Sequence, residues 1–485
     1  MLWTAGIFFP HALKNVHRDF MSPDQSRGVM RSRDIVRYED RGGNSRALRE
    51  SKYGWLFRIR RSRFLLLLIL SSFLIRAAAV EFLRNPSQGP EFEQMGADGI
   101  EFNTLGLHLA ANHRYELTKD VPTSFRAPGL PFLLAVIYRS VGEKYRVVYG
   151  LFCLLGALTC LFAYFLAREL LSEEWSRIAS LLCTFYIPHI YFATIFASEN
   201  VFAAALPAAL WCMVRYFRRG GLKTLLAAGL ILGYATLTRP FALIILPMWL
   251  ALLLLKKGSG LEFRVAAPAM VLAGFLIVTA PWVARNYRVH HRFVVVATNG
   301  GSTFYGSNNS RVLSEPYDLG NWIPTTELPD RDLIDASPDE VSRDKLEWSL
   351  GFRWVRQHAV SMPLLCAFKL IRLWLPRIDT NNRNYFRAEL FGYTPIGLLF
   401  LLAAIQTVRQ RQFHSFEWAA VHATIAATVI TAIVFYGSAR FRDANAAILV
   451  LYASVGLQWI GSIFKAEAGC TFIKVQNGGS EAPAV

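Results

Sequence analysis

The chain has none of the short motifs typical of several common enzyme classes. It contains no P-loop, no Gly-x-Ser-x-Gly and no His-Glu-x-x-His, so a nucleotide-phosphate loop, a hydrolase serine elbow and a zincin-type zinc site are excluded. His290 and His291 are adjacent, which is the wrong spacing for two metal ligands on one helical face. We predict no metal site, although a divalent cation remains compatible with the chemistry considered below.

Cysteine is also scarce, and its distribution excludes a disulfide framework. No two cysteines form a Cys-x-x-Cys pair, and most of them lie inside apolar runs. We therefore interpret them as small residues facing lipid or the protein core. The six are Cys153, Cys160, Cys183, Cys212, Cys366 and Cys470.

A cleavable signal peptide is not evident, because the first long apolar run begins only after about 60 polar residues. Residues 1–63 carry 14 Lys and Arg against 6 Asp and Glu. We predict that they form a basic, poorly ordered cytoplasmic tail with no catalytic role. Met21 and Met30 are alternative translation starts.

Apolar residues dominate the rest of the chain. Hydrophobic residues make up 53% of the sequence and the mean hydropathy is +0.29. Apolar runs of about 20 residues recur after Phe64. In a bilayer each run must satisfy its own backbone hydrogen bonds, so the sequence predicts an all-α polytopic membrane protein. The net charge of +17 then indicates cytoplasmic loops and lipid headgroup contact rather than nucleic acid.

We predict about 10 (10–12) transmembrane helices. The ten expected spans are 64–82, 145–167, 178–195, 201–217, 222–236, 241–255, 265–283, 390–408, 418–435 and 444–464. Two further apolar segments, Pro128–Gly142 and Met362–Leu375, are too short to cross a core of about 30 Å. We expect both to be juxtamembrane or re-entrant helices at the outer surface.

The basic residues predict which side each loop faces. With the N-terminus in the cytoplasm and Pro128–Gly142 not spanning, three basic loops fall inside, as the positive-inside rule requires. Two large polar loops then face outwards, at 84–127 and at 284–361, and loops of this size commonly bind ligands or carry out chemistry. The membrane core covers 64–283, further membrane helices cover 362–464, and 465–485 is a short tail.

The first outer loop contains two candidate catalytic carboxylates. Asp98 precedes an apolar pattern typical of a short helix on the membrane surface, and Glu101 follows one turn later. Asp98 would be held near the helix N-terminus by free backbone N–H groups. It could therefore be a helix cap, a catalytic carboxylate, or both.

Five arginines and one more carboxylate stand at predicted helix ends. Because arginine prefers phosphate and carboxylate partners, the arginines could bind a phosphate or ordinary lipid headgroups. Glu199 could be a functional carboxylate or a simple first-turn residue. The arginines are Arg126 in Arg-Ala-Pro-Gly-Leu-Pro, Arg239 in Leu-Thr-Arg-Pro, Arg285 in Pro-Trp-Val-Ala-Arg-Asn-Tyr, and Arg440 and Arg442 in Arg-Phe-Arg.

Taken in this order, the motifs resemble those of the bacterial GT-C glycosyltransferases, and more narrowly the protein-mannosyltransferase and aminoarabinose-transferase group. The resemblance covers roughly 64–464. Two positions depart from the family pattern: Phe102 stands where a tyrosine is usual, and Asp443-Ala-Asn-Ala-Ala replaces a proline-rich ending. The second departure weakens a carrier-binding role for Arg440 and Arg442.

The resemblance implies transfer of a sugar from a polyprenyl-phosphate carrier to an acceptor, with inversion, at the extracytoplasmic face of the inner (plasma) membrane. Asp98 would then be the general base, with Glu101 as a less favoured substitute, and Glu199 would contact the acceptor or sugar. Arg126, Arg239, Arg285, Arg440 and Arg442 would bind the substrate or the carrier phosphate. The acceptor could be a protein hydroxyl, a lipid or a cell-envelope glycan.

Two rival functions fit a membrane protein of this kind. A transporter or lipid flippase would show internal repeats and charges near the bilayer midplane. A polyprenyl-linked glycan ligase or polymerase would share the large outer loop, but it would lack the early aspartate.

Overall fold

The computed structural model describes residues 43–90, 97–256, 261–376 and 386–477. Chain contacts divide the protein into two units, 1–59 and 60–485, and the membrane core and candidate site belong to the second. Residues 1–42 of the predicted tail lie outside the described residues, and from Gly43 the chain is helical. The end of the predicted C-terminal tail, 478–485, also lies outside them.

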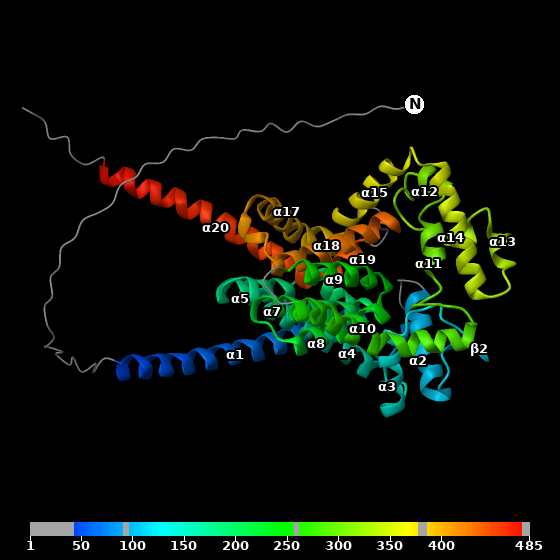
Figure 1. Cartoon of the computed structure of the whole chain (residues 1–485), viewed down its shortest axis with the longest axis horizontal. Helices are drawn as coiled ribbons and strands as arrows, with labels where there is room; N and C mark the ends of the chain where they lie inside the picture. The colour runs from blue at the N-terminus through cyan, green and yellow to red at the C-terminus, as the bar shows by residue number, and fades with distance from the viewer. Residues whose placement is uncertain (1–42, 91–96, 257–260, 377–385, 478–485) are drawn as a thin grey trace, which may run out of the picture. The chain divides into compact units, whose positions relative to one another are not determined.

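The described chain is almost entirely helical, which confirms the predicted all-α membrane fold (Figure 1). In the first half the helices are α1 (Gly43–Leu83), α2 (Ala97–Asn112), α3 (Gly129–Val141), α4 (Tyr145–Leu170), α5 (Glu173–Thr184), α6 (Ile187–Phe192), α7 (Glu199–Arg219), α8 (Leu222–Thr238), η2 (Pro240–Ile244), α9 (Ile245–Leu255) and α10 (Leu261–His290). The second half contains α11 (Gly300–Gly306), α12 (Ser310–Ser314), η3 (Thr325–Glu327), α13 (Arg331–Asp335), α14 (Glu340–Gln357), α15 (Met362–Trp374), η4 (Ala388–Tyr393), α17 (Thr394–Arg409), η5 (Arg411–Phe413), α18 (Phe416–Val434), α19 (Ala439–Asp443) and α20 (Ala446–Asn477). Two short antiparallel strands, β1 (Glu116–Thr118) and β2 (Val121–Pro122), form a hairpin.

Seven helices within the described ranges are long and apolar enough to cross a membrane. They are Arg60–Leu83, Tyr145–Leu170, Glu199–Arg219, Arg264–His290, Ala388–Arg409, Phe416–Val434 and Ala446–Phe464. Each coincides with one of the ten expected spans. Two other expected spans fold as the shorter apolar helices Leu222–Thr238 and Pro240–Leu255.

The prediction of one continuous span over Ile178–Ile195 is wrong. Helix α5 ends at Thr184, and α6 begins at Ile187 with Pro188 in its first turn. Proline lacks an N–H, and its ring clashes with the carbonyl four residues earlier, here that of Thr184. Proline can kink a helix or break it, as α10 continues through Pro268 and Pro281, and at Pro188 the helix breaks.

The two short apolar segments form separate helices as expected, and their place at the outer surface stays a prediction. Helices α3 and α15 each have 13 residues, which at 1.5 Å per residue gives about 20 Å. That length falls short of a hydrocarbon core of about 30 Å. Gly142, with a φ of +77°, ends α3, because glycine tolerates this backbone conformation.

The core is a bundle in which α4, α7, α8 and α10 pack side by side (Figure 1). Helices α8 and α10 approach closely through glycines: a Cβ on Gly229 would meet the carbonyl oxygen of Val271 at 2.1 Å. Helix α7 is central, because 83% of its apolar window is buried against 22% for α1. Its first residue, Glu199, is therefore fixed within the most buried part of the bundle.

Both large loops are structured. The first carries α2 and the β1–β2 hairpin, and α2 packs against α3. The second carries α11 to α14, of which α11 packs against α14 (Figure 1). Its small core contains Tyr305, Val312, Ile323, Leu350 and Trp354.

Candidate active site

Asp98 and Glu101 stand in the first turns of α2 and share one arginine. Arg126, three residues before α3, donates from Nη2 to Asp98 Oδ1 at 2.7 Å. Its Nε donates to the carboxylate of Glu101. Acidic residues suit the first turn of a helix, where free N–H groups point towards them. The helix thus presents two carboxylates to the segment that follows the hairpin.

A second group of charges joins the first through Arg440 of α19. Arg440 Nη1 lies 3.2 Å from Asp98 Oδ2, and Arg440 Nε lies 2.6 Å from Glu199 Oε1. Arg239, which directly follows α8, places Nη1 2.7 Å from the same Glu199 oxygen. Glu199 is fully buried. The structure therefore links three carboxylates and three guanidinium groups in one alternating network.

A glycine allows the parts of this network to approach one another. A Cβ on Gly129, in the first turn of α3, would come within 2.3 Å of Thr238 Oγ1 at the end of α8. The Tyr234 hydroxyl donates to the carbonyl oxygen of Gly129 at 2.8 Å. Because only glycine fits here, α3 lies directly against the end of α8, and Arg126 and Arg239 line the same cavity.

The network borders a cavity of about 190 Å³ between the membrane core and the second loop. Asp98, Arg126, Arg239 and Arg440 line it, whereas Glu101 and Glu199 do not. Its other walls are Phe102, Phe241, Phe435, Tyr436 and Phe441, with Asn299, Gly300 and Thr303 from the second loop. The cavity therefore combines one partly exposed carboxylate, three guanidinium groups and aromatic walls.

Charge, more than burial, sets the protonation of Asp98. Burial raises the pKa of its carboxyl group, but the guanidinium groups of Arg126 and Arg440 outweigh this effect and hold the pKa below its usual value. Burial lowers the pKa of the Arg126 and Arg440 side chains, but the nearby carboxylates outweigh burial and raise the pKa of both. Asp98 is therefore ionised at neutral pH and faces permanently charged arginines.

One donor in the cavity wall has no protein acceptor. Arg239 Nε is buried and lacks a hydrogen-bond partner among the described residues. The guanidinium also lies between the rings of Phe241 and Phe441, 5.7 and 5.5 Å from their centroids. A buried N–H without an acceptor costs about 1–3 kcal/mol, and an anion in the cavity would remove that cost.

Arg285 and Arg442, which sequence analysis grouped with the carrier-binding arginines, do not line this cavity. Arg442 is buried between Glu389 and Asp443, and its guanidinium carbon lies 3.3 Å from the ring centroid of Tyr393. Its Nη1 also donates to Leu373 O at 3.1 Å, which ties α19 to the end of α15. Its contacts are those of a structural residue.

Arg285 instead binds the backbone of the first large loop. Its Nη1 donates to Thr123 O at 2.7 Å and to Ser124 Oγ at 2.9 Å. Glu340, the first residue of α14, accepts from Thr123 Oγ1 at 2.6 Å and from Ser124 N–H at 2.7 Å. Both residues thus fix the backbone just before Arg126. Sequence analysis missed Glu340, because it lies in an acidic stretch with no motif to distinguish it.

Replacing Glu340 by glutamine is expected to lower kcat about tenfold with a smaller change in KM. Glutamine has one acceptor oxygen, so it can accept from Ser124 N–H only if its amide donates to Thr123 Oγ1, which now donates to Glu340. This reversal would shift the backbone just before Arg126. Steady-state rates and thermal melting of the purified protein measure the effect. The matched control is Glu327→Gln, which removes an exposed partner of Arg311 in the same loop and should change neither. Loss of melting temperature at unchanged kcat would show that Glu340 only stabilises the fold.

No group of three or more His, Cys, Asp and Glu residues within the described part of the chain could hold a metal ion. The three carboxylates of the network each contact an arginine instead. These residues do not fit a metal site, and we assign no step to a metal.

The sequence and the fold were compared with known proteins. Residues 125–284 match the family of dolichyl-phosphate-mannose-protein mannosyltransferases. This range contains Arg126, Glu199 and Arg239. Among curated proteins, none matches the chain.

Solved structures show the fold. An oligosaccharyltransferase of Archaeoglobus fulgidus, crystallised with Zn and sulfate, has a TM-score of 0.51 at 14% identity over 86% of this chain and 51% of its own. The archaeal oligosaccharyltransferase AglB of A. fulgidus, with an inhibitory peptide and a dolichol-phosphate, gives 0.49 at 13% identity over 88% of this chain and 53% of its own. ArnT of Cupriavidus metallidurans, bound to undecaprenyl phosphate, gives 0.39 at 14% identity over 83% and 78%.

This chain thus spans about half the length of the oligosaccharyltransferases to which it is similar. The first of them supports the fold, and the family match covers the central membrane core. The resemblance predicted from the motifs is therefore confirmed: the chain matches the dolichyl-phosphate-mannose-protein mannosyltransferase family over residues 125–284 and has a fold similar to that of GT-C glycosyltransferases.

Proposed function

We propose that the protein is a glycosyltransferase that moves a sugar from a polyprenyl-phosphate carrier to an acceptor hydroxyl with inversion. The observation that carries this proposal is Asp98, an ionised carboxylate in a cavity wall between Arg126 and Arg440. Support for the donor class comes from the matched family, whose name describes a dolichyl-phosphate-linked mannose. A lipid carrier delivers the sugar along the membrane, so the reaction needs no nucleotide site.

The arginines would bind the carrier phosphate. Arg239 offers a buried Nε without an acceptor among the described residues, and Arg126 and Arg440 line the same cavity. Guanidinium groups match the geometry of phosphate oxygens, and they stabilise the negative charge that builds up as the phosphate leaves. Glu199 is fully buried and outside the cavity lining, so it would orient Arg239 and Arg440 rather than touch sugar or acceptor.

Asp98 would take the proton from the acceptor. Of the two loop carboxylates only Asp98 lines the cavity, while Glu101 holds Arg126 from the other side. A carboxylate on one face of the sugar and the phosphate on the other is the arrangement required for inversion through an oxocarbenium-like state. The free site holds Asp98 between two guanidinium groups. A phosphate that shares those groups would raise the basicity of Asp98, and donor binding would thereby prepare the base.

The site would face the extracytoplasmic side. Asp98, Glu199, Arg239 and Arg440 stand at helix ends opposite the basic ends of α4 and α7. Loops rich in Lys and Arg remain in the cytoplasm, so the end of the bundle that carries Asp98 and Glu199 would be outside. In this orientation the lipid carrier would reach the cavity from the outer leaflet.

The experiment that tests the function supplies polyprenyl-phosphate-linked sugars to the purified protein in membranes that contain the natural acceptors. We expect release of free polyprenyl phosphate and a product whose anomeric configuration, determined by NMR, is opposite to that of the donor. A product with retained configuration would contradict the single displacement with Asp98 as base. Movement of intact donor across the bilayer without release of carrier phosphate would instead favour the flippase alternative.

A further inference from the structure

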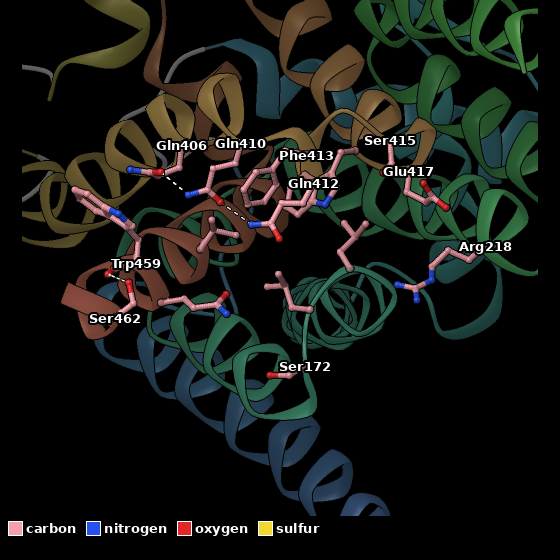
Figure 2. Close-up of a pocket in the computed structure, with 15 residues that line it drawn as sticks. Ser172, Arg218, Gln406, Gln410, Gln412, Phe413, Ser415, Glu417, Trp459 and Ser462 are labelled. Carbon is pink, nitrogen blue, oxygen red and sulfur yellow. Dashed lines mark hydrogen bonds between the residues drawn. The ribbon is translucent and has the colours of Figure 1, made fainter. Parts of the chain in front are cut away.

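A second, larger cavity lies at the other end of the bundle (Figure 2). It has a volume of about 550 Å³, within the usual range for small-molecule sites. Its walls come from the α4–α5 junction, the end of α7, the segment from α17 to α18, and α20. Glu199 begins the 21-residue α7 and Arg218 lies at its end, so about 30 Å separates this cavity from the candidate active site.

One wall is built from glutamine side chains. Gln412 donates to Gln410 at 2.6 Å, and Gln410 donates to Gln406 at 2.7 Å, as the dashed lines in Figure 2 show. Gln406 is buried in the last turn of α17, next to the buried Thr407 and before Arg409. A buried amide on a membrane helix is costly unless it has a partner or a function. Gln406 Oε1 accepts from Gln410, so the Nε2 group of Gln406 is the end of the chain and is open to a ligand in the cavity that Gln406 lines.

Two unpaired charges of opposite sign complete the lining. Among the described residues, neither Arg218 nor Glu417 has a hydrogen bond or an ion pair, and both project from the same side of the cavity (Figure 2). The indole ring of Trp459 adds a flat apolar face, while Trp418 lines the cavity from the core, where its ring packs on Phe413 and His422. Amides, a carboxylate and indole rings are the groups that bind sugar hydroxyls and the C–H faces of sugar rings, and a guanidinium binds phosphate.

Exposed apolar residues flank the cavity on the same helices. Val408 and Leu401 of α17 are 77% and 58% exposed, and Phe464 of α20 is 66% exposed. In a membrane this surface contacts acyl or prenyl chains. A ligand with its headgroup in the cavity and its chain on this surface would be a lipid of the adjacent leaflet.

We propose that this cavity binds the sugar-phosphate headgroup of a lipid in the leaflet opposite the active site. Arg218 binds the phosphate, while the glutamine chain and Glu417 bind sugar hydroxyls. A zwitterionic phospholipid headgroup would use the two charges but would leave the chain of three hydrogen-bonded glutamines unused. The binding is separate from sugar transfer, because no residue of the cavity belongs to the candidate active site.

The experiment titrates the detergent-purified full chain with hexose 1-phosphate and follows tryptophan fluorescence. We expect saturable quenching that Trp459→Phe removes. The affinity should be at least tenfold higher than for inorganic phosphate or free hexose. Arg218→Gln should weaken binding at least tenfold. The matched control is Arg411→Gln, an exposed arginine at the same end of the bundle that does not line the cavity, and it should leave the affinity unchanged.

Further variants separate this site from the active site. Asp98→Asn and Arg239→Gln, which alter only the other cavity, should retain full hexose 1-phosphate quenching even where transfer is lost. Equal affinity for inorganic phosphate would overturn the proposal and leave a simple anion site. Tighter binding of phosphoethanolamine would overturn it in favour of a phospholipid headgroup. Absence of saturable quenching, or an equal loss in Arg411→Gln, would also overturn it.

Discussion

Replacing Asp98 by asparagine is expected to lower the rate of sugar transfer by about 10²–10⁴-fold while the protein remains folded. Asparagine fills the same space but cannot accept the acceptor's proton. Asp98 is about one-third exposed, so Arg126 and Arg440 keep access to water when its charge is removed. Release of polyprenyl phosphate measures the rate, and size-exclusion chromatography in detergent measures folding.

Two matched variants make this result specific. Glu101→Gln removes a carboxylate that touches Arg126 but does not line the cavity, so it should reduce the rate less than Asp98→Asn. Asp120→Asn removes an exposed carboxylate in the same loop, paired with Arg114, and should leave the rate unchanged. If Glu101→Gln proves the more damaging of the two, the general base is assigned to the wrong carboxylate.

The pH dependence provides a second measure of the same base. In the free protein Arg126 and Arg440 outweigh the effect of burial and hold the pKa of Asp98 below its usual value, so the carboxylate stays ionised until the pH falls through that lowered pKa. A bound phosphate shares the guanidinium charges and raises the pKa. The acid limb of kcat should therefore lie at higher pH than the acid limb of kcat/KM, and Asp98→Asn should abolish the difference.

The fold could be predicted where helices are long and apolar, because each such run has one stable conformation in a bilayer. Seven expected spans appear with the required length. The predicted span Ile178–Ile195 was wrong because the mean hydropathy of its 18 residues does not register Pro188, which interrupts the helix. Average hydropathy describes partition into lipid and does not say whether a proline kinks a helix, as in α10, or ends it, as at Pro188.

The site could be predicted only in part, because sequence order does not give distance. Asp98, Arg126, Glu199, Arg239 and Arg440 stood out as charges at outer helix ends, and the fold brings these ends together. Arg442 stood out equally, yet it points into a buried network two residues from Arg440. A two-residue step rotates a helix position by about 200°, so the two arginines face opposite ways, and boundaries predicted to within a few residues do not say which of them faces the site.

Arg440 is the residue whose loss should have the second large effect, because it joins the proposed base to the buried carboxylate. Arg440→Gln leaves Glu199 fully buried with Arg239 as its remaining ion-pair partner. Removal of one partner from a buried ion pair costs up to about 3–5 kcal/mol, so the melting temperature should fall together with transfer. The double variant Arg440→Gln/Glu199→Gln restores the charge balance of the network but takes from Arg239 its carboxylate partner, so the melting temperature should recover only in part.

Transfer should not return in the double variant if Arg440 binds the carrier phosphate, since the cavity would still lack one of its three guanidinium groups. A residue that only supported the fold would give the opposite result, with activity returning as stability does. The melting temperature and kcat/KM would be measured for the unchanged protein, for Arg440→Gln, for Glu199→Gln and for the double variant. Coupling between Arg440 and Glu199 appears in the melting temperature, whereas coupling of Arg440 to phosphate appears in kcat/KM. In that case the network would keep a phosphate-binding Arg440 charged and oriented, with Glu199 as its buried ion-pair partner and Asp98 beside it.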